Sequence, residues 1–122
     1  MGITGIGTDI VEVERIHDLV GKWNGRFLHR VFCESELEYC LNAKNASERL
    51  AGRFAAKEAV IKSLGRSVPW KAIKVVSTEV GRPIVHLRSS PGLEEQDNSV
   101  IELSISHTKQ YATATAICVK KD

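Results

Sequence analysis

The stretch Phe54–Lys62, which reads FAAKEAVIK, decides how the rest of this chain is interpreted. Its residue spacing is that of an amphipathic helix, and the pattern extends back to Leu50 and on to Leu64. At about 100° per residue, Glu58 and Lys62 lie one turn apart on an arc otherwise made of alanines. Such a bare arc lets another element or a ligand approach closely. A carboxylate and an ammonium group on such an arc could bind a metal ion and a phosphate. The alternative is a solvent-exposed ion pair, which would only stabilise the helix by about 0.2–0.5 kcal/mol.

The N-terminal segment Gly5–Val11, which reads GIGTDIV, predicts a strand with two different faces. Ile6, Thr8 and Ile10 share one face, and Asp9 shares the other with two glycines. Glycines at alternate strand positions usually mark the close approach of a ligand or of another backbone. Asp9 is therefore a candidate ligand for a hard metal ion. The alternative is that it caps a helix starting two residues later.

A third segment, Ile101–Thr108, alternates apolar and polar residues and predicts another strand. Its apolar residues share one face with His107, so this histidine ends the strand on the side of the core or of a pocket. A histidine in such a place is more often a hydrogen-bonded structural residue than a catalytic one. The segment 111–119, rich in Ala, Thr and Val, follows as the partner strand of a hairpin.

The remaining pattern indicates an α+β fold, with helices packed on an antiparallel sheet in a single domain over residues 1–122. We expect Ser35 to cap the third helix, with Glu38 as its capping-box partner, and Gly65 to end the fourth. The predicted helices cover residues 12–21, 26–31, 34–41 and 46–64, and the predicted strands 3–10, 73–79, 83–88, 101–107 and 111–119.

Composition narrows the class of protein. The chain has 122 residues and a net charge of +2, which is too small to argue for nucleic acid as a partner. It contains no run of 18 apolar residues and no secretory signal pattern, so we expect no membrane association. Three cysteines without close spacing predict reduced thiols in a cytoplasmic protein rather than disulfides or a zinc site.

Four motifs together resemble those of the holo-[acyl-carrier-protein] synthases. They are Gly5–Ile10, Leu50–Ala59, Gly81–Pro83 and Ser104–Thr108, and the resemblance extends from about residue 3 to 119. It implies a phosphopantetheinyl transferase-like fold and a Mg²⁺-dependent reaction. In that reaction 4′-phosphopantetheine passes from coenzyme A to a serine of apo acyl carrier protein. The products are holo acyl carrier protein and adenosine 3′,5′-bisphosphate, and the reaction supports fatty acid biosynthesis.

The resemblance and the residue chemistry together give the candidate site residues. Asp9 and Glu58 would hold Mg²⁺, which usually takes one or two carboxylates plus substrate phosphates and water. Lys62 would neutralise charge on the leaving phosphate and completes the candidate catalytic set. A metal-bound water and a carboxylate are both candidates for the base that accepts the serine proton. The candidate coenzyme A contacts are Lys44, Arg53, Lys62, Gly81, Arg82, Pro83 and His107.

Basic residues in the N-terminal helical region indicate a docking face. Lys22, Arg26 and Arg30 are four residues apart, and they form one stripe if the turn near Gly25 keeps the helical phase. The resemblance implies that acidic acyl carrier protein docks here, and that the enzyme is a homotrimer with its active sites at subunit interfaces. The alternative is a solvated helix face. The candidate docking residues are Arg15, Lys22, Arg26, Phe27 and Arg30.

Two departures from the family pattern concern coenzyme A contacts: the connection Arg66–Pro69 is short and poor in glycine, and Asn45 stands where a basic residue is expected. Two other functions are compatible with the same residues. A catalytically silent phosphate-binding or protein-docking module would have no need of two convergent carboxylates. A Mg²⁺-dependent phosphohydrolase would need a positioned water where the carrier serine enters.

Overall fold

The computed structural model describes residues 2–23, 25–88 and 99–121. Every predicted helix and strand is present, with ends a few residues from the expected ones, and the fold class is α+β as predicted. The elements are β1 (Gly2–Glu12), α1 (Val13–Trp23), α2 (Gly25–Val31), α3 (Glu34–Leu41), α4 (Ala46–Leu64), the 3₁₀ helix η1 (Trp70–Ala72), β2 (Ile73–Ser77), β3 (Pro83–Leu87), β4 (Ser99–His107) and β5 (Tyr111–Lys120).

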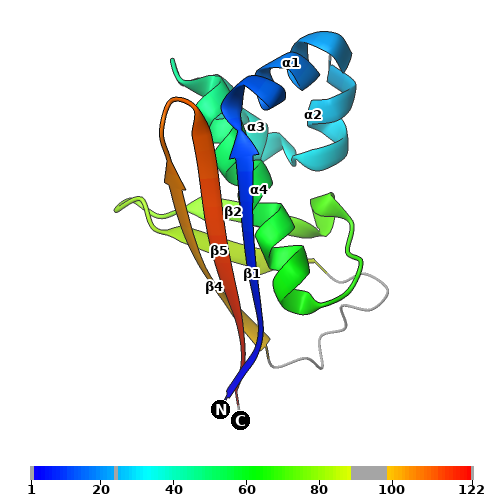
Figure 1. Ribbon diagram of the computed structural model, residues 1–122, viewed down its shortest axis with the longest axis vertical. Coiled ribbons are helices and arrows are strands. Elements are labelled where there is room, and N and C mark those ends of the chain that lie inside the picture. The colour runs from blue at the N-terminus through cyan, green and yellow to red at the C-terminus, as the bar shows by residue number, and fades with distance from the viewer. Residues whose placement is uncertain (1, 24, 89–98, 122) are drawn as a thin grey trace.

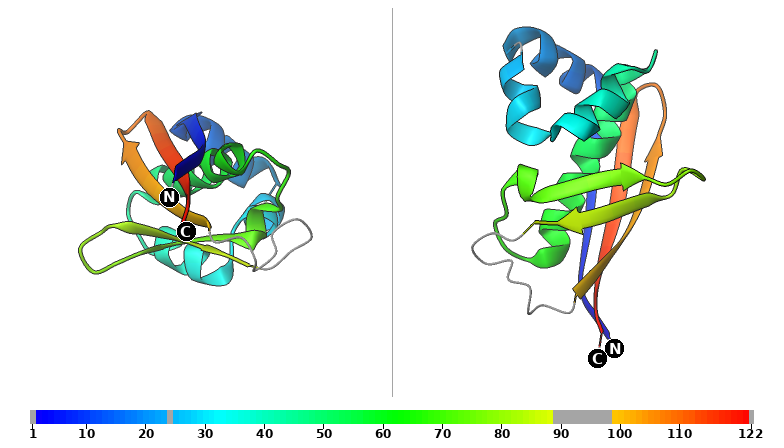
Figure 2. Two further views of the ribbon diagram at one scale, coloured as in Figure 1. Left: turned by 90° about the horizontal axis from the view of Figure 1, so that it is seen from below. Right: turned by 180° about the vertical axis from the view of Figure 1, so that it is seen from behind.

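The strands divide into two antiparallel sheets. Three of them form a long sheet in the order β1–β5–β4, and β2 and β3 form a separate hairpin. The long sheet runs most of the height of the molecule, and its ends bring the two termini together because Gly2 pairs with Lys120 (Figure 1). The β2–β3 hairpin crosses α4 and packs beside β4 of the long sheet (Figure 2). Helix α4 therefore forms the centre of the fold. No helix in the described ranges is long and apolar enough to cross a membrane.

Small residues bring α4 and the long sheet into direct backbone contact. A Cβ atom on Gly7 would overlap the carbonyl oxygen of Ala59, and one on Gly5 would overlap that of Ser63. The glycines predicted to mark a close approach thus accommodate the helix backbone rather than a ligand. The alanines that line the two surfaces are buried, namely Ala51, Ala55 and Ala59 on α4 and Ala112, Ala114 and Ala116 on β5.

The start of α3 differs from the predicted one. The Glu36 carboxylate accepts a hydrogen bond from the backbone N–H of Cys33 at 2.9 Å, so the expected pairing of Ser35 with Glu38 is wrong. Glu36 points inward because it has a buried partner on α4, and Glu38 remains exposed. The end of α4 is as predicted, with Gly65 in the left-handed conformation at φ 70°.

That buried partner is Lys57, which forms an ion pair with Glu36 at 2.7 Å inside the protein. Lys57 Nζ also donates to the carbonyl oxygens of Val31 at 2.8 Å and Trp70 at 3.1 Å. The other oxygen of Glu36 accepts the Val75 backbone N–H at 3.0 Å. Burial lowers the pKa of Lys57, and the hydrogen bond that Lys57 donates to Glu36 opposes that shift. The pair ties together the end of α2, the start of α3, α4, η1 and β2.

Candidate active site

Strand β1 and helix α4 bring Asp9 and Lys62 together. The Lys62 ammonium donates to the Asp9 carboxylate at 3.3 Å and to the Thr8 carbonyl oxygen at 3.0 Å. Gly5 lies beside Ser63 and Gly7 beside Ala59, so each step of two residues along β1 moves back by about one turn of α4. Asp9 therefore lies against the preceding turn of α4, which is the one that carries Glu58.

Glu58 accepts a hydrogen bond at Oε1 from the indole N–H of Trp70, at 3.0 Å. It also lines a groove of about 650 Å³, which we call the Glu58 groove. The groove combines an apolar wall, three arginines and this one carboxylate. Its lining residues are Arg15, Leu19, Trp23, Arg26, Phe27, Arg30, Val31, Phe54, Glu58 and Trp70. A candidate metal ligand and most of the candidate docking residues thus share one surface.

Lys22 lies outside the Glu58 groove, although it lines a neighbouring depression together with Arg15. Helix α1 ends at Trp23 and α2 starts at Gly25 with a different direction, so Lys22, Arg26 and Arg30 do not form one helical stripe (Figure 1). The Lys22 ammonium lies over the Trp23 ring, 5.4 Å from its centre, and lines a shallower depression with several acids. Arg15 of α1, rather than Lys22, joins the two arginines of α2 at the Glu58 groove.

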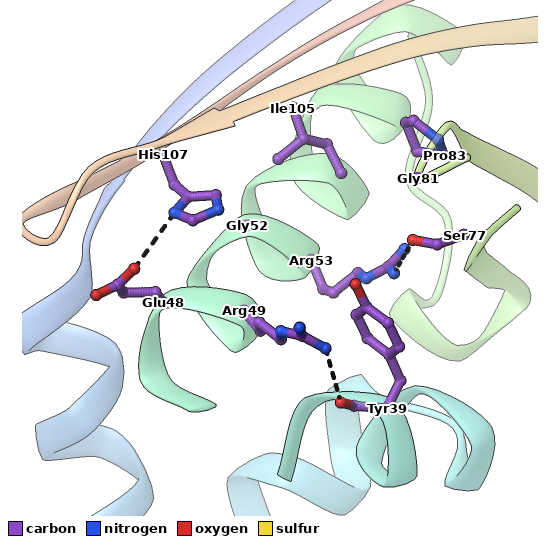
Figure 3. Close-up of a pocket in the computed structure, with 10 residues that line it drawn as sticks. All are labelled: Tyr39, Glu48, Arg49, Gly52, Arg53, Ser77, Gly81, Pro83, Ile105 and His107. Carbon is purple, nitrogen blue, oxygen red and sulfur yellow. Dashed lines mark hydrogen bonds and ion pairs between the residues drawn. The ribbon is translucent and has the colours of Figure 1, made fainter. Parts of the chain in front are cut away.

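A second cavity, which we call the Arg53 pocket, has a volume of about 170 Å³ and collects several candidate coenzyme A contacts (Figure 3). Arg53 is 5% exposed and donates from Nη2 to the Ser77 hydroxyl at 2.6 Å. Its buried Nη1 makes no hydrogen bond within the described part of the chain. The lining residues are Tyr39, Glu48, Arg49, Gly52, Arg53, Ser77, Gly81, Pro83, Ile105 and His107.

A pair of guanidinium groups shares one aromatic ring in this pocket. Arg49 and Arg53 lie over the Tyr39 ring, 4.4 and 4.7 Å from its centre. The ring faces relieve part of the repulsion between the two cations. Two fixed guanidinium groups, one with an unused buried N–H, form a site for an oxyanion such as phosphate.

Three other candidate contacts reach the Arg53 pocket from the end of β4 and from the β2–β3 turn. His107 projects into it from the end of β4, beside Ile105 as the strand alternation predicts, and its Nδ1 is 3.4 Å from the Glu48 carboxylate (Figure 3). Gly81 lies in the β2–β3 turn at φ 83°, a conformation that favours glycine, and Pro83 begins β3.

Two candidates predicted from the sequence lie outside the pocket lining. Arg82 is exposed and pairs with Glu102 at 3.1 Å. Lys44 is exposed in the turn before α4.

Several residues of these cavities were missed by the sequence interpretation. Arg49 stands one helical turn before Arg53, so the i,i+4 spacing of two arginines was an available signal. Tyr39, Ser77 and Trp70 gave no such signal, because tertiary contacts alone bring α3, the hairpin and η1 against α4.

The two cavities lie on different sides of α4. Among the described residues they share none of their lining. Arg53 and Glu58 are separated by about 140° around the helix and about 7.5 Å along it. A ligand held in the Arg53 pocket is therefore not next to Glu58 of the same chain unless it wraps around the helix.

Comparison with known proteins identifies the family of this chain. A model of the 4′-phosphopantetheinyl transferase superfamily matches residues 5–116. The holo-[acyl-carrier-protein] synthase of Halothermothrix orenii is 43% identical over 120 residues, which cover 94% of this chain and 96% of that protein. The chain therefore belongs to the 4′-phosphopantetheinyl transferase superfamily.

Solved structures give the same result for the fold. The holo-[acyl-carrier-protein] synthase of Neisseria meningitidis superposes with a TM-score of 0.87 at 34% identity, over 98% of this chain and 100% of that chain. A holo-(acyl-carrier-protein) synthase from Bacillus anthracis, in complex with CoA (3′,5′-ADP), superposes with a TM-score of 0.82 at 34% identity, over 98% of both chains. The α+β architecture is thus shared with these holo-[acyl-carrier-protein] synthases of known structure.

Proposed function

We propose that this protein is a holo-[acyl-carrier-protein] synthase, which transfers 4′-phosphopantetheine from coenzyme A to a serine of apo acyl carrier protein. The assignment is carried by one observation: in a chain that matches this family, Asp9 of β1 contacts Lys62 of α4, and Glu58 lies one helical turn before Lys62. These are two carboxylates for a cation and one ammonium group for a phosphate. The relative from Bacillus anthracis, with its bound CoA (3′,5′-ADP), supports coenzyme A as the substrate.

The Arg53 pocket is our proposed site for the phosphate-bearing nucleotide end of coenzyme A. The unused Nη1 of Arg53 would donate to a phosphate oxygen, which would satisfy a buried polar group that is otherwise costly. His107 would provide a further contact, and the rigid Gly81–Pro83 turn would close one side. Lys44 and Arg82, although outside the pocket lining, are exposed side chains long enough to serve as further phosphate contacts.

Asp9 and Glu58 are suited to hold Mg²⁺. Each uses one oxygen in a hydrogen bond, with Lys62 and Trp70 respectively, and the other oxygen accepts no hydrogen bond from the described residues. The described ranges contain no cluster of three or more His, Cys, Asp or Glu that could form a closed metal site. This fits an ion that takes one or two carboxylates plus substrate phosphates. When bound, Mg²⁺ would neutralise charge on the pyrophosphate and polarise the attacked phosphorus.

Lys62 has the freedom that a phosphate contact needs. Its side chain is 54% exposed, and its ammonium group already lies 3.3 Å from a candidate metal ligand. There it would oppose the negative charge that builds up on the leaving phosphate as the bond breaks. The Asp9 carboxylate and the Thr8 carbonyl oxygen hold the ammonium in place, so that little reorganisation is required during the reaction.

The reaction is tested by incubating the protein with coenzyme A, Mg²⁺ and an apo carrier protein, followed by intact mass measurement of the carrier. We expect the carrier to gain one phosphopantetheine group and adenosine 3′,5′-bisphosphate to be released. Cleavage of coenzyme A without modification of the carrier would indicate a phosphohydrolase instead. An unchanged carrier together with intact coenzyme A would indicate a silent binding module.

The Glu58 groove is the proposed docking surface for the carrier protein. Arg15, Arg26 and Arg30 give it a positive rim, and Phe27 gives it an apolar anchor. An acidic helix docked there would bring the carrier serine toward Glu58. Rim charges mainly speed the encounter of two proteins and make it sensitive to salt.

Charge reversal tests the docking surface. Arg15→Glu combined with Arg26→Glu should strongly raise the KM for the carrier and leave that for coenzyme A nearly unchanged. Lys22→Glu is a matched control, because Lys22 lies outside the groove lining and its reversal should have a much smaller effect. An unchanged KM for the carrier in the double variant would show that the carrier docks on another face.

We also propose a homotrimer with active sites completed between subunits. The face of β1 that points away from α4 exposes Ile3, Ile6 and Ile10 at 69%, 67% and 65%, which is a large apolar surface for a protein of this size. The separation of the Arg53 pocket from Glu58 within one chain supports the same arrangement, since a neighbouring subunit can bring the two together.

Mixing of two inactive variants tests whether the sites are shared. Glu58→Gln and Arg53→Ala each damage a different half of the site, so exchange of their subunits should restore part of the activity if each site uses both chains. Sedimentation equilibrium should give the mass of three chains. If subunit exchange is demonstrated and no activity is recovered, each chain holds a complete site.

The proposed setting is the cytoplasm, in support of fatty acid biosynthesis. The three thiols Cys33, Cys40 and Cys118 are free, and two of them are buried, which suits a reducing compartment. Purification with or without a reducing agent should therefore give protein of the same mass and the same activity. Modification of the half-buried Cys33 thiol is the expected exception.

A further inference from the structure

Trp70 is held at both ends by consecutive residues of α4. Lys57 Nζ donates to its backbone carbonyl oxygen at 3.1 Å, and its indole N–H donates to Glu58 Oε1 at 3.0 Å. Its ring also packs at a tilt against Phe54, with ring centres 6.0 Å apart. The Lys57 ammonium is itself fixed by the buried carboxylate of Glu36. The buried ion pair thus anchors the backbone of Trp70, and Phe54 and Glu58 hold its indole.

The hydrogen bond restricts how the Glu58 carboxylate can turn. A free glutamate side chain populates several rotamers, and ordering it costs entropy. The indole N–H is a donor only, so it can hold an ionised carboxylate oxygen without competing as a metal ligand. It occupies Oε1 and leaves Oε2, which accepts no hydrogen bond from the described residues.

We propose that Trp70 is a positioning residue that orients the Glu58 carboxylate for cation binding, and that Lys57 positions Trp70 in turn. The inference rests on the proposed function, in which Glu58 is a ligand of the divalent cation. It adds a residue outside the motifs of the sequence. Groups that orient ligands of this kind typically change metal affinity about 10- to 100-fold when they are removed.

The variant Trp70→Phe tests this role, because it removes the N–H donor and keeps an aromatic ring, although a smaller one, beside Phe54. Calorimetric titration of Mn²⁺ into the protein with coenzyme A present measures cation affinity without turnover. We expect an affinity about 10-fold weaker than that of the wild type. In turnover assays the half-saturating Mg²⁺ concentration should rise similarly, with little change in kcat at saturating Mg²⁺.

A double variant provides the control. In a Glu58→Gln background, Trp70→Phe should cause no further loss of Mn²⁺ affinity if Trp70 acts through Glu58. Equal affinities of the wild type and Trp70→Phe, or a tighter Trp70→Phe, would overturn the positioning role alone. A wild-type protein that takes up no Mn²⁺ with coenzyme A would overturn the metal assignment, and the positioning role would fail with it.

Indole N–H signals give a readout that does not depend on how Trp70→Phe folds. The chain has two tryptophans, so ¹⁵N NMR shows two such signals, and Trp23→Phe identifies which is which. The Trp70 signal should shift upfield on Glu58→Gln, because a neutral amide accepts a weaker hydrogen bond than a carboxylate. A Trp70 signal that is unaffected by Glu58→Gln would contradict the bond on which the inference depends.

Discussion

Replacement of Gly7 by alanine should damage both the stability and the chemistry of this protein, because the residue lies where β1 meets the backbone of α4. A Cβ atom at this position would overlap the Ala59 carbonyl oxygen and lie 2.8 Å from both the Lys62 Cβ atom and the Ser63 backbone nitrogen. All three neighbours are helix backbone atoms or a Cβ atom fixed to that backbone, so none of them can rotate away.

The size of the effect follows from these distances. Even the two contacts at 2.8 Å are about 0.6 Å short of the 3.4 Å at which ordinary van der Waals contact begins, and the overlap with the carbonyl oxygen is more severe. Strand and helix must therefore separate. Overpacking of this kind costs about 1–3 kcal/mol, and we expect the upper part of that range because backbone is involved. For a chain of this length the melting temperature should fall by roughly 10 °C.

The displacement also reaches the candidate site, because Asp9 follows Gly7 by two residues and contacts Lys62 at 3.3 Å. Turnover at saturating Mg²⁺ should fall, and the half-saturating Mg²⁺ concentration should rise. Gly2→Ala is the matched control on the same strand, since a Cβ atom there meets nothing within 4 Å. Thermal unfolding and steady-state kinetics of both variants give the answer. A Gly7→Ala protein as stable and active as Gly2→Ala would refute the close packing of β1 on α4.

Three further results are expected. Glu36→Gln should lower the free energy of unfolding in urea by about 3–5 kcal/mol, because it leaves Lys57 charged and unpaired in the interior. Adding Lys57→Met should recover much of the loss. A loss below about 1 kcal/mol would show that the pair is not buried as described. Lys62→Ala should reduce kcat more than His107→Ala does, and the effect of His107→Ala should fall mainly on the KM for coenzyme A. Equal effects of the two variants on kcat and on KM would contradict the assignment of Lys62 as a transition-state contact and His107 as a ground-state contact. Burial raises the pKa of the Cys40 thiol to about 11, so iodoacetamide at pH 8 should label it only after unfolding, and rapid labelling of the folded protein would contradict its burial.

Local periodicity explains why so much of the fold could be predicted. Helix α4 has its apolar and small residues at helical spacing, and β4 has strict alternation, so each element type follows from side chains near one another in the chain. The position of Gly65 likewise predicts the helix end, because a left-handed residue stops a helix whatever packs around it. The chemistry of Asp9, Glu58 and Lys62 could be singled out for the same local reason.

Contacts between distant segments decided what the sequence left open. The glycines of β1 could have served a ligand or another backbone, and only the packing on Ala59 and Ser63 shows that they serve a helix. The phase between Lys22 and Arg26 depended on a turn whose geometry no periodicity specifies.

The amino-acid sequence by itself determined the class of fold, the family and the identity of the charged groups, because these depend on residue type and short-range spacing. Only the tertiary structure decided that Trp70 holds Glu58 and that Arg49 joins Arg53 over Tyr39. It also decided that the two cavities lie on different sides of α4. Each of these results depends on how elements far apart in the chain pack around one helix, and such packing leaves no periodic trace in the sequence.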